Sequence, residues 1–173
     1  MSALENFIPL QLAVLTVSDT RTRANDSSGD YLERALCTAG HRLAARELVR
    51  DDIYRMRAIV AQWIADDGVD GVLVTGGTGF TGRDSTPEAL RPLLDKEMPG
   101  FGEMFRAVSV AEIGTASLQS RAFAGLANGT FLFALPGSTS ACRTAWEQIL
   151  SSQLDSRTMP CNLAGLKPRL REH

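Results

Sequence analysis

The sequence predicts an α/β fold whose sheet is mostly parallel, with one antiparallel strand. Short apolar runs of strand length alternate along the chain with longer segments in which apolar residues recur at helical spacing. The run Val72-Leu73-Val74 is apolar at successive positions, as expected for a strand buried on both faces of a parallel sheet. Two further apolar runs flank Asn128-Gly129, a strong β-hairpin signal, and this hairpin supplies the antiparallel strand.

The first half of the chain is expected to alternate strands and helices around one sheet. Capping residues before the periodic apolar segments, and glycine after them, mark the helix ends. In order, the expected elements are an irregular arm (residues 1–9), a buried strand (10–17), a helix that starts at Ser27 with Asp30 in its capping box and stops before Gly40, a more polar strand near a sheet edge (41–49), and an amphipathic helix (53–64).

The second half is expected to hold three helices and the hairpin. A short helix over residues 87–94 begins after the predicted N-cap Thr86, with proline at its first position and glutamate in its first turn. The later elements are a helix with apolar positions from 101 to 108, hairpin strands at 123–127 and 130–135, a helix from Ser138 or Thr139 to about 150, and an irregular tail (155–173). A chain of 173 residues is expected to form a single domain over residues 1–173.

The composition is that of an ordinary folded protein. Hydrophobic residues make up 44% and charged residues 22%, and the net charge of −2 gives nothing to attract nucleic acid or an anionic membrane. We see neither a signal peptide nor an apolar run long enough to span a bilayer. The three cysteines lack CxxC spacing and fit reduced thiols. We therefore expect a cytoplasmic protein without nucleic-acid or membrane partners.

The segment between the central strand and the next helix is rich in glycine. Gly76, Gly77, Gly79 and Gly82 fall within seven positions, more than an ordinary turn requires, and such a loop lets a ligand approach the backbone closely. A strand end, a glycine loop and a helix start together form the anion sites of many α/β proteins. Asp84 lies in this loop, and a carboxylate beside phosphates indicates a divalent metal between them. The alternative is a flexible surface loop.

Two other strand ends repeat this arrangement. Pro136-Gly137-Ser138 joins the second hairpin strand to a helix, and Ser18-Asp19 closes the first strand. Since ligands of open α/β sheets bind at the carboxyl ends of the strands, we expect these segments to face one crevice with the glycine loop.

Motifs for several familiar chemistries are missing from the sequence. The glycine loop lacks the Lys-Ser/Thr of a P-loop, it is not the dinucleotide-binding GxGxxG, and no Gly-x-Ser-x-Gly elbow occurs. Only His41 and His173 are available as histidines. Carboxylates, backbone amides, hydroxyls and a few arginines remain. This set suits metal-assisted transfer at phosphorus, in which positioning and charge neutralisation do most of the work.

Several separated motifs, in order along the chain, resemble the molybdenum cofactor biosynthesis MoaB/Mog family. The motif with most residues in common is the glycine loop, and the resemblance extends over nearly the whole chain. The matching segments are Leu-Thr-Val-Ser-Asp (15–19), Ser28-Gly29, the loop from Thr75 to Ala89, Met-Pro-Gly-Phe-Gly-Glu (98–103), Ser120-Arg121 and Leu-Pro-Gly-Ser (135–138).

This resemblance implies a three-layer α/β/α molybdopterin-binding fold that assembles as a homo-trimer or as a homo-hexamer, a dimer of trimers. It implies molybdopterin binding and, in active members, adenylylation of molybdopterin by ATP with Mg²⁺. In that reaction the terminal phosphate of the pterin attacks the α-phosphate of ATP and pyrophosphate leaves. The alternative is an inactive member that binds molybdopterin or a precursor without adenylylating it.

The essential acids of the family fall on Asp84 and Asp51, which the resemblance implies as catalytic and metal-binding residues. Arg50 stands where the family usually has proline before the second acid. A structural role is the alternative in both cases. Asp84 would then be a turn residue that caps the next helix. At the second position, Asp52 beside Asp51 could instead cap the helix expected over residues 53–64.

The expected ligand-binding residues lie on the same strand ends. Backbone amides of the glycine loop would hold phosphate, Glu88 would orient a ribose or pterin group, and Ser138 would bind the pterin phosphate. A tight turn, a first-turn glutamate and an N-cap are the respective alternatives. The full set is Gly76, Gly77, Thr78, Gly79, Thr86, Glu88, Pro136, Gly137, Ser138, Ser18 and Asp19.

Overall fold

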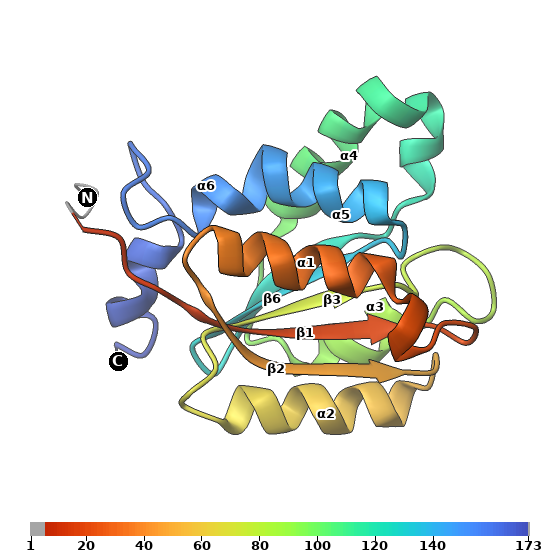
Figure 1. Cartoon of the computed structure of the whole chain (residues 1–173), viewed down its shortest axis with the longest axis horizontal. Coiled ribbons are helices and arrows are strands. Elements are labelled where there is room, and N and C mark those ends of the chain that lie inside the picture. The colour runs from red at the N-terminus through yellow and green to blue at the C-terminus, as the bar shows by residue number, and fades with distance from the viewer. Residues whose placement is uncertain (1–5, 173) are drawn as a thin grey trace.

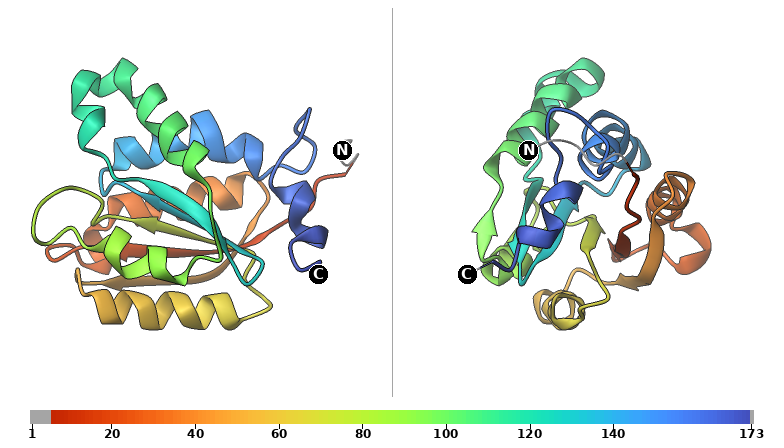
Figure 2. Two further views of the ribbon diagram at one scale, coloured as in Figure 1. Left: turned by 180° about the vertical axis from the view of Figure 1, so that it is seen from behind. Right: turned by 90° about the vertical axis from the view of Figure 1, so that its left-hand side faces the viewer.

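The computed structural model describes residues 6–172 and places a six-stranded sheet between two layers of helices (Figures 1 and 2). The sheet order is β2-β1-β3-β6-β5-β4. The strands are β1 (Gln11–Val17), β2 (Arg42–Val49), β3 (Gly71–Thr75), β4 (Lys96–Glu97), β5 (Phe123–Ala127) and β6 (Thr130–Leu135). The helices are α1 (Ser27–Thr38), α2 (Ile53–Ala65), α3 (Thr86–Leu90), α4 (Pro99–Ile113), α5 (Thr139–Ala145) and α6 (Ser151–Gln153).

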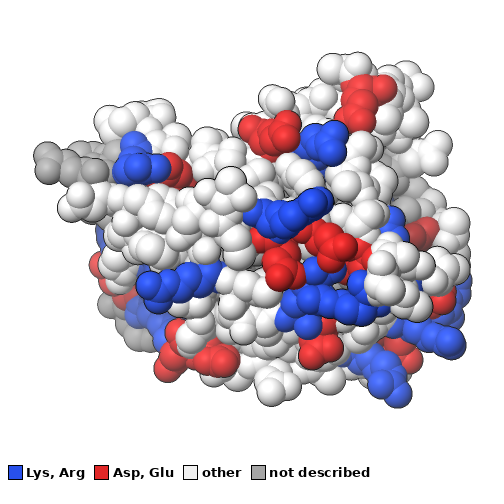
Figure 3. Space-filling model, in the orientation of Figure 1, with Lys and Arg blue, Asp and Glu red and all other residues white. Residues whose placement is uncertain are grey.

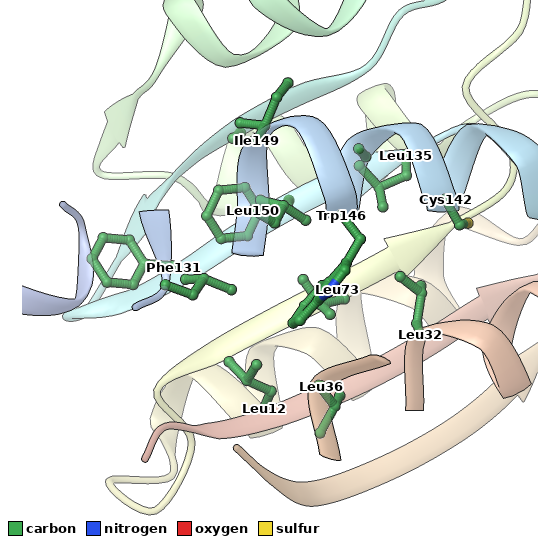
Figure 4. Close-up of a cluster of buried hydrophobic side chains, with 14 of the residues drawn as sticks. Leu12, Leu32, Leu36, Leu73, Phe131, Leu135, Cys142, Trp146, Ile149 and Leu150 are labelled. Carbon is green, nitrogen blue, oxygen red and sulfur yellow. The ribbon is translucent and has the colours of Figure 1, made fainter. Parts of the chain in front are cut away.

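Alternation along the strands divides the core between the two faces of the sheet. Leu12 of β1 and Leu73 of β3 pack with α1, α4, α5 and the π-helical segment Trp146–Leu150 that continues α5 (Figure 4). Their sequence neighbours Ala13 and Val72 pack on the other face with α2 and α3. All four side chains are fully buried, and both faces of β1 and β3 are therefore covered, as predicted for central strands of a parallel sheet.

The predicted hairpin and edge strand are confirmed. β5 and β6 pair antiparallel, and Asn128 and Gly129 between them have φ of 47° and 76°, the conformation of a type I′ turn. β2 lies at one edge of the sheet. The other edge is β4, two residues that no sequence pattern indicates. β4 pairs antiparallel with β5, so β5 alone among the described strands runs against the others.

Two predicted helix starts are wrong by one residue. The N-cap of α1 is Asp26, whose carboxylate accepts the N–H of Gly29 (3.1 Å), while Asp30 pairs with Arg46 (2.7 Å). In α3 the hydroxyl of Thr86 turns inward and donates to the carbonyl of Gly76 (2.8 Å). Buried polar groups need partners, and this interior carbonyl takes the hydroxyl that would otherwise cap the helix.

Register brings three strand ends together at one edge of the sheet. Thr16 of β1 pairs with Thr75 of β3, and Thr75 pairs with Leu135 of β6. The N–H of Gly76 then continues the ladder by donating to the carbonyl of Leu135 (2.9 Å). The segments that follow β1, β3 and β6 therefore leave the sheet side by side. Along residues 6–172, no helix is both long and apolar enough to cross a membrane.

Candidate functional site

A cleft of about 440 Å³ opens where β1, β3 and β6 end. Its other wall comes from α4, from the 3₁₀ segment Gly114–Gln119 and from α5. The predicted residues that line it are Ser18, Gly76, Gly77, Thr78, Gly79, Asp84, Pro136, Gly137 and Ser138. The expected single crevice is thus present, and nine of the predicted residues face it. Asp19, Asp51, Thr86 and Glu88 do not line this cleft, although the hydroxyl of Thr86 donates to the carbonyl of Gly76, which does.

Glycine is required at the start of the loop. Gly76 has φ of 107°, and a Cβ there would lie 2.1 Å from the carbonyl oxygen of Val17. At Gly77, where φ is 67°, a Cβ would lie 2.7 Å from a carboxylate oxygen of Asp51. These two glycines therefore let the loop pass directly over the end of β1 and beside the second acid.

We expect Gly76→Ala to lower the free energy of unfolding by at least about 2 kcal/mol, because the new methyl group would collide with backbone at a positive φ. Urea denaturation followed by circular dichroism measures the change. Gly82→Ala is the matched control, since a Cβ at Gly82 has nothing within 4 Å. Equal stability of the two variants would contradict the proposed constraint on the loop.

Asp84 faces the cleft as a carboxylate. Its Oδ2 accepts the backbone N–H and the hydroxyl of Thr81 at 2.8 and 2.6 Å. Burial raises the pKa of Asp84, but the hydrogen bonds from Thr81 and from the N–H of Gly79, together with the charge of Arg121, outweigh it and hold the pKa below its usual value. The group is therefore ionised at neutral pH.

Asp51 lies behind the turn at Gly77. Its carboxylate accepts the N–H of Ser85 (3.2 Å) and the hydroxyl of the same residue. Capping of α2 is done by the neighbouring Asp52, which accepts the N–H groups of Tyr54 and Arg55, both at 2.9 Å. Asp51 is therefore not needed as a cap, and it joins the start of α2 to the glycine loop.

Arg121 fastens the glycine loop to the rest of the fold. Its backbone N–H donates to the carbonyl of Thr78 (3.0 Å), and its guanidinium donates to the carbonyls of Gly79 (2.7 Å) and Asp84 (2.6 Å). The same guanidinium pairs with the carboxylate of Glu88 and lowers the pKa of that group. Glu88 is therefore paired with the arginine that holds the loop, and it does not line the main cleft.

Asp19 makes a bidentate ion pair with Arg83. The Nε and Nη2 of Arg83 donate to its two carboxylate oxygens at 2.8 and 2.7 Å, and this pairing holds the pKa of Asp19 below its usual value. Asp19 also accepts the N–H of Asp51 (3.2 Å). It thus links the end of β1 to both the glycine loop and the second acid. Ser18 supports the same turn by accepting the N–H of Arg21 (3.1 Å).

Sequence reasoning missed a cation that the structure brings into the cleft. Arg21 is the one positively charged side chain among the described residues that line it. Its guanidinium donates to the hydroxyl of Ser28 and lies 3.7 Å from the buried carboxylate of Asp26. Asp26 is held in turn by Arg46 (2.8 Å) and by the hydroxyl of Thr16 (2.7 Å). Arg21 lies in a polar loop, and no local pattern indicates its place.

The far wall of the cleft was also not predicted. α4 contributes Ser109 and Glu112, and α5 contributes Ser140 and Thr144. The hydroxyl of Thr144 donates to the carboxylate of Glu112 (2.9 Å), which ties the two helices together across the cleft. Figure 2 shows that α4 and the 3₁₀ segment after it project beyond the sheet. This wall of the cleft is therefore built by helices packed beside the sheet and not by the strand ends.

Comparison with known proteins identifies the family. Residues 13–156 match the family model described as "Probable molybdopterin binding domain". Molybdenum cofactor biosynthesis protein B of Escherichia coli K12 is 56% identical over 156 residues, 90% of this chain and 92% of that protein. The Bacillus subtilis protein of the same name is 44% identical over 142 residues, 82% and 84% of the two chains.

Solved structures agree with this assignment. A crystal structure of a molybdenum cofactor biosynthesis protein B superposes with a TM-score of 0.86 at 36% identity, covering 96% of this chain and 98% of the other. The tungsten cofactor synthesizing protein MoaB from Pyrococcus furiosus gives 0.80 at 34% identity, covering 95% and 98%. The three-layer fold implied by the sequence is confirmed, and the chain belongs to the MoaB/Mog family of molybdenum cofactor biosynthesis proteins.

Proposed function

We propose that this chain acts in molybdenum cofactor biosynthesis by transferring the adenylyl group of ATP to molybdopterin. The observation that carries this proposal is the cleft at the sheet edge. The ionised Asp84 of the glycine loop lines it, and so do Arg21, from the loop after β1, and Ser138, at the start of α5. The cleft therefore offers an acid for a metal and a cation for a phosphate within one cavity.

In the proposed reaction, an oxygen of the terminal phosphate of molybdopterin bonds to the α-phosphorus of ATP. The bond from that phosphorus to the bridging oxygen of the β-phosphate breaks, and pyrophosphate leaves with the electron pair. The attacking phosphate is already anionic near neutral pH, so no strong general base is required. Arg21 and Ser138 would hold the attacking phosphate, and the amides around Gly77 would hold the α-phosphate.

Mg²⁺ fits the acids available at the glycine loop. Among the described residues no three His, Cys, Asp or Glu side chains gather as a metal cage, so this chain would offer Asp84 and Asp51 and leave the other positions to phosphate oxygens and water. Mg²⁺ in phosphoryl-transfer sites is usually held in this way, by one or two carboxylates and the substrate. When bound, the ion would neutralise negative charge on the phosphates.

The proposal is tested by mixing purified protein with molybdopterin, ATP and Mg²⁺ and following pyrophosphate release. We expect release that requires all three additions. The second candidate is a protein that binds molybdopterin without adenylylating it, which Arg50 in place of the usual proline favours. Bound molybdopterin, detected by calorimetry, without pyrophosphate release would establish that second function.

Arg21→Gln is expected to weaken molybdopterin binding by about tenfold or more, because a charge-assisted hydrogen bond to phosphate would be lost. Calorimetric titration measures the dissociation constant. Arg23→Gln is the control: Arg23 lies two residues away, is 56% exposed and does not line the cleft. Equal loss of affinity in both variants would mean that net charge, and not the position of Arg21, is what matters.

We further propose that the protein works in the cytoplasm as a homo-trimer or homo-hexamer. Support from the structure is the apolar surface of the projecting wall, where Val110, Ile113 and Leu118 are exposed by 52%, 49% and 80%. Light scattering of the purified protein distinguishes the two assemblies by mass.

A further inference from the structure

A second cleft, of about 590 Å³, lies next to the main one. Its charged lining residues are Arg50, Asp51, Asp52, Arg55 and Arg83. Arg50, Asp51 and Asp52 lie in the connection from β2 to α2, Arg55 lies in the first turn of α2, and Arg83 lies in the glycine loop. In Figure 3 basic and acidic side chains are mixed over this face, and basic ones reach the right-hand edge, where β2 ends and α2 begins in Figure 1.

The glycine loop separates the two clefts. Consecutive loop residues face different cavities, since Arg83 lines the second cleft and Asp84 lines the main one. Gly77 lines the main cleft, yet a Cβ built on it would lie 2.7 Å from a carboxylate oxygen of Asp51, which lines the second. A group bound at the acids would thus have one cavity on each side.

Two guanidinium groups in the second cleft, those of Arg50 and Arg55, are free to bind a ligand. Within residues 6–172, no hydrogen bond or ion pair joins the side chain of Arg50 or Arg55 to another group, whereas Arg83 is paired with Asp19. Asp52 in the same cleft already accepts two backbone N–H groups at the start of α2. Arginine is the side chain best suited to bind phosphate oxygens, because its planar fork donates two parallel hydrogen bonds.

We infer that the second cleft binds the pyrophosphate portion of the nucleotide, with Arg50 and Arg55 as its ligands. This inference rests on the proposed adenylyl transfer. Displacement at phosphorus needs the attacking and leaving oxygens roughly in line on opposite sides of the phosphorus atom. An α-phosphate at the acids, attacked from the main cleft, would release its leaving group toward the second cleft.

The charge balance of the step favours cations at this position. As the bond to the α-phosphorus breaks, its electron pair passes to the bridging oxygen of the β-phosphate, so negative charge grows on pyrophosphate. Arg50 and Arg55 would stabilise that charge as it develops.

The inference is tested by calorimetric titration with inorganic pyrophosphate, with and without Mg²⁺, which needs no turnover. We expect Arg50→Gln and Arg55→Gln each to raise the dissociation constant about tenfold. Arg34→Gln is the matched control, because Arg34 is an exposed arginine of α1 outside both clefts.

Two results would overturn the inference: wild-type protein that does not bind pyrophosphate, or binding that is equally tight in the Arg50 and Arg55 variants. Both side chains are exposed, so thermal unfolding should show that the variants keep the fold. The outcome is separable from that for the proposed function. Arginine-dependent pyrophosphate binding without adenylylation would refute the function alone, and adenylylation with arginine-independent binding would refute the inference alone.

Discussion

Asp84→Asn is expected to lower the rate of adenylyl transfer at least about a hundredfold while leaving the fold intact, because the change removes the charge that would hold Mg²⁺ at the phosphates. The amide oxygen of asparagine can still accept the two hydrogen bonds that Thr81 donates to Oδ2. The loop should therefore keep its shape. Initial rates of pyrophosphate release at saturating Mg²⁺ measure the loss.

The control for this variant is Asp67→Asn, which removes the same charge from a carboxylate that is 83% exposed and lies outside both clefts. We expect its rate to equal that of the wild type. Since the pKa of Asp84 is below its usual value, the wild-type acid stays ionised throughout the neutral range, so protonation of this group should not alter the rate between about pH 6 and pH 8. Full activity of Asp84→Asn would remove the metal-site assignment.

Arg46→Met is expected to reduce the free energy of unfolding by about 3–5 kcal/mol, the cost of leaving a buried charge without its partner. The side chain of Arg46 is 4% exposed and lies 2.8 Å from Asp26, 2.7 Å from Asp30 and within hydrogen-bonding distance of Glu33. Chemical denaturation monitored by circular dichroism gives the difference. Arg23→Gln, which breaks only an exposed pair with Glu33, should change stability by less than about 1 kcal/mol.

The same network predicts how stability depends on pH. Burial raises the pKa of Asp26, but hydrogen bonds from Arg46, Thr16 and Gly29 outweigh it, so the folded-state pKa lies below the unfolded one. Asp26 therefore contributes stability that is fully present above the unfolded pKa, near 3.9, and is lost as pH falls through the folded pKa. Two results would contradict the proposed role of the Arg46–Asp26 pair. One is wild-type stability that does not decrease as pH falls below the unfolded pKa of Asp26, and the other is an Arg46 variant as stable as the Arg23 control.

Much of the fold follows from local patterns in the sequence. Continuous apolar runs predict the buried strands, a more polar run predicts the edge strand β2, and Asn128-Gly129 predicts the hairpin. These patterns succeed because each depends on residues close together in the chain. β4 has only two residues, and its pairing with β5 is decided by the packing around it.

The errors at the helix starts have a common cause. Ser27 and Thr86 carry the hydroxyl that an N-cap needs, but in both cases the neighbouring residue, Asp26 or Ser85, takes the N-cap position. Thr86 instead satisfies a buried carbonyl of the glycine loop. Local sequence shows which groups are able to cap, whereas the choice between them depends on partners ten or more residues away.

The candidate site also has parts that the local sequence predicts and parts that it does not. The glycine loop with Asp84, and the turn at Ser138, can be found from sequence because strand ends of a parallel sheet meet at one edge. Arg21 and Glu112 cannot, because Arg21 lies against Asp26, which Arg46 of β2 holds in place, and Glu112 is held by Thr144 from another helix. Asp19 was expected to face the ligand, and its pairing with Arg83 from the loop places it beside the cleft instead.

Single-turnover analysis of the product tests the central claim most directly. Protein in excess over molybdopterin is mixed with ATP and Mg²⁺, and the products are identified by mass spectrometry. We predict adenylyl-molybdopterin and pyrophosphate in equal amounts from the wild type, and neither from Asp84→Asn. Molybdopterin that remains unmodified on wild-type protein, although bound and supplied with ATP and Mg²⁺, would contradict the proposed adenylyl transfer.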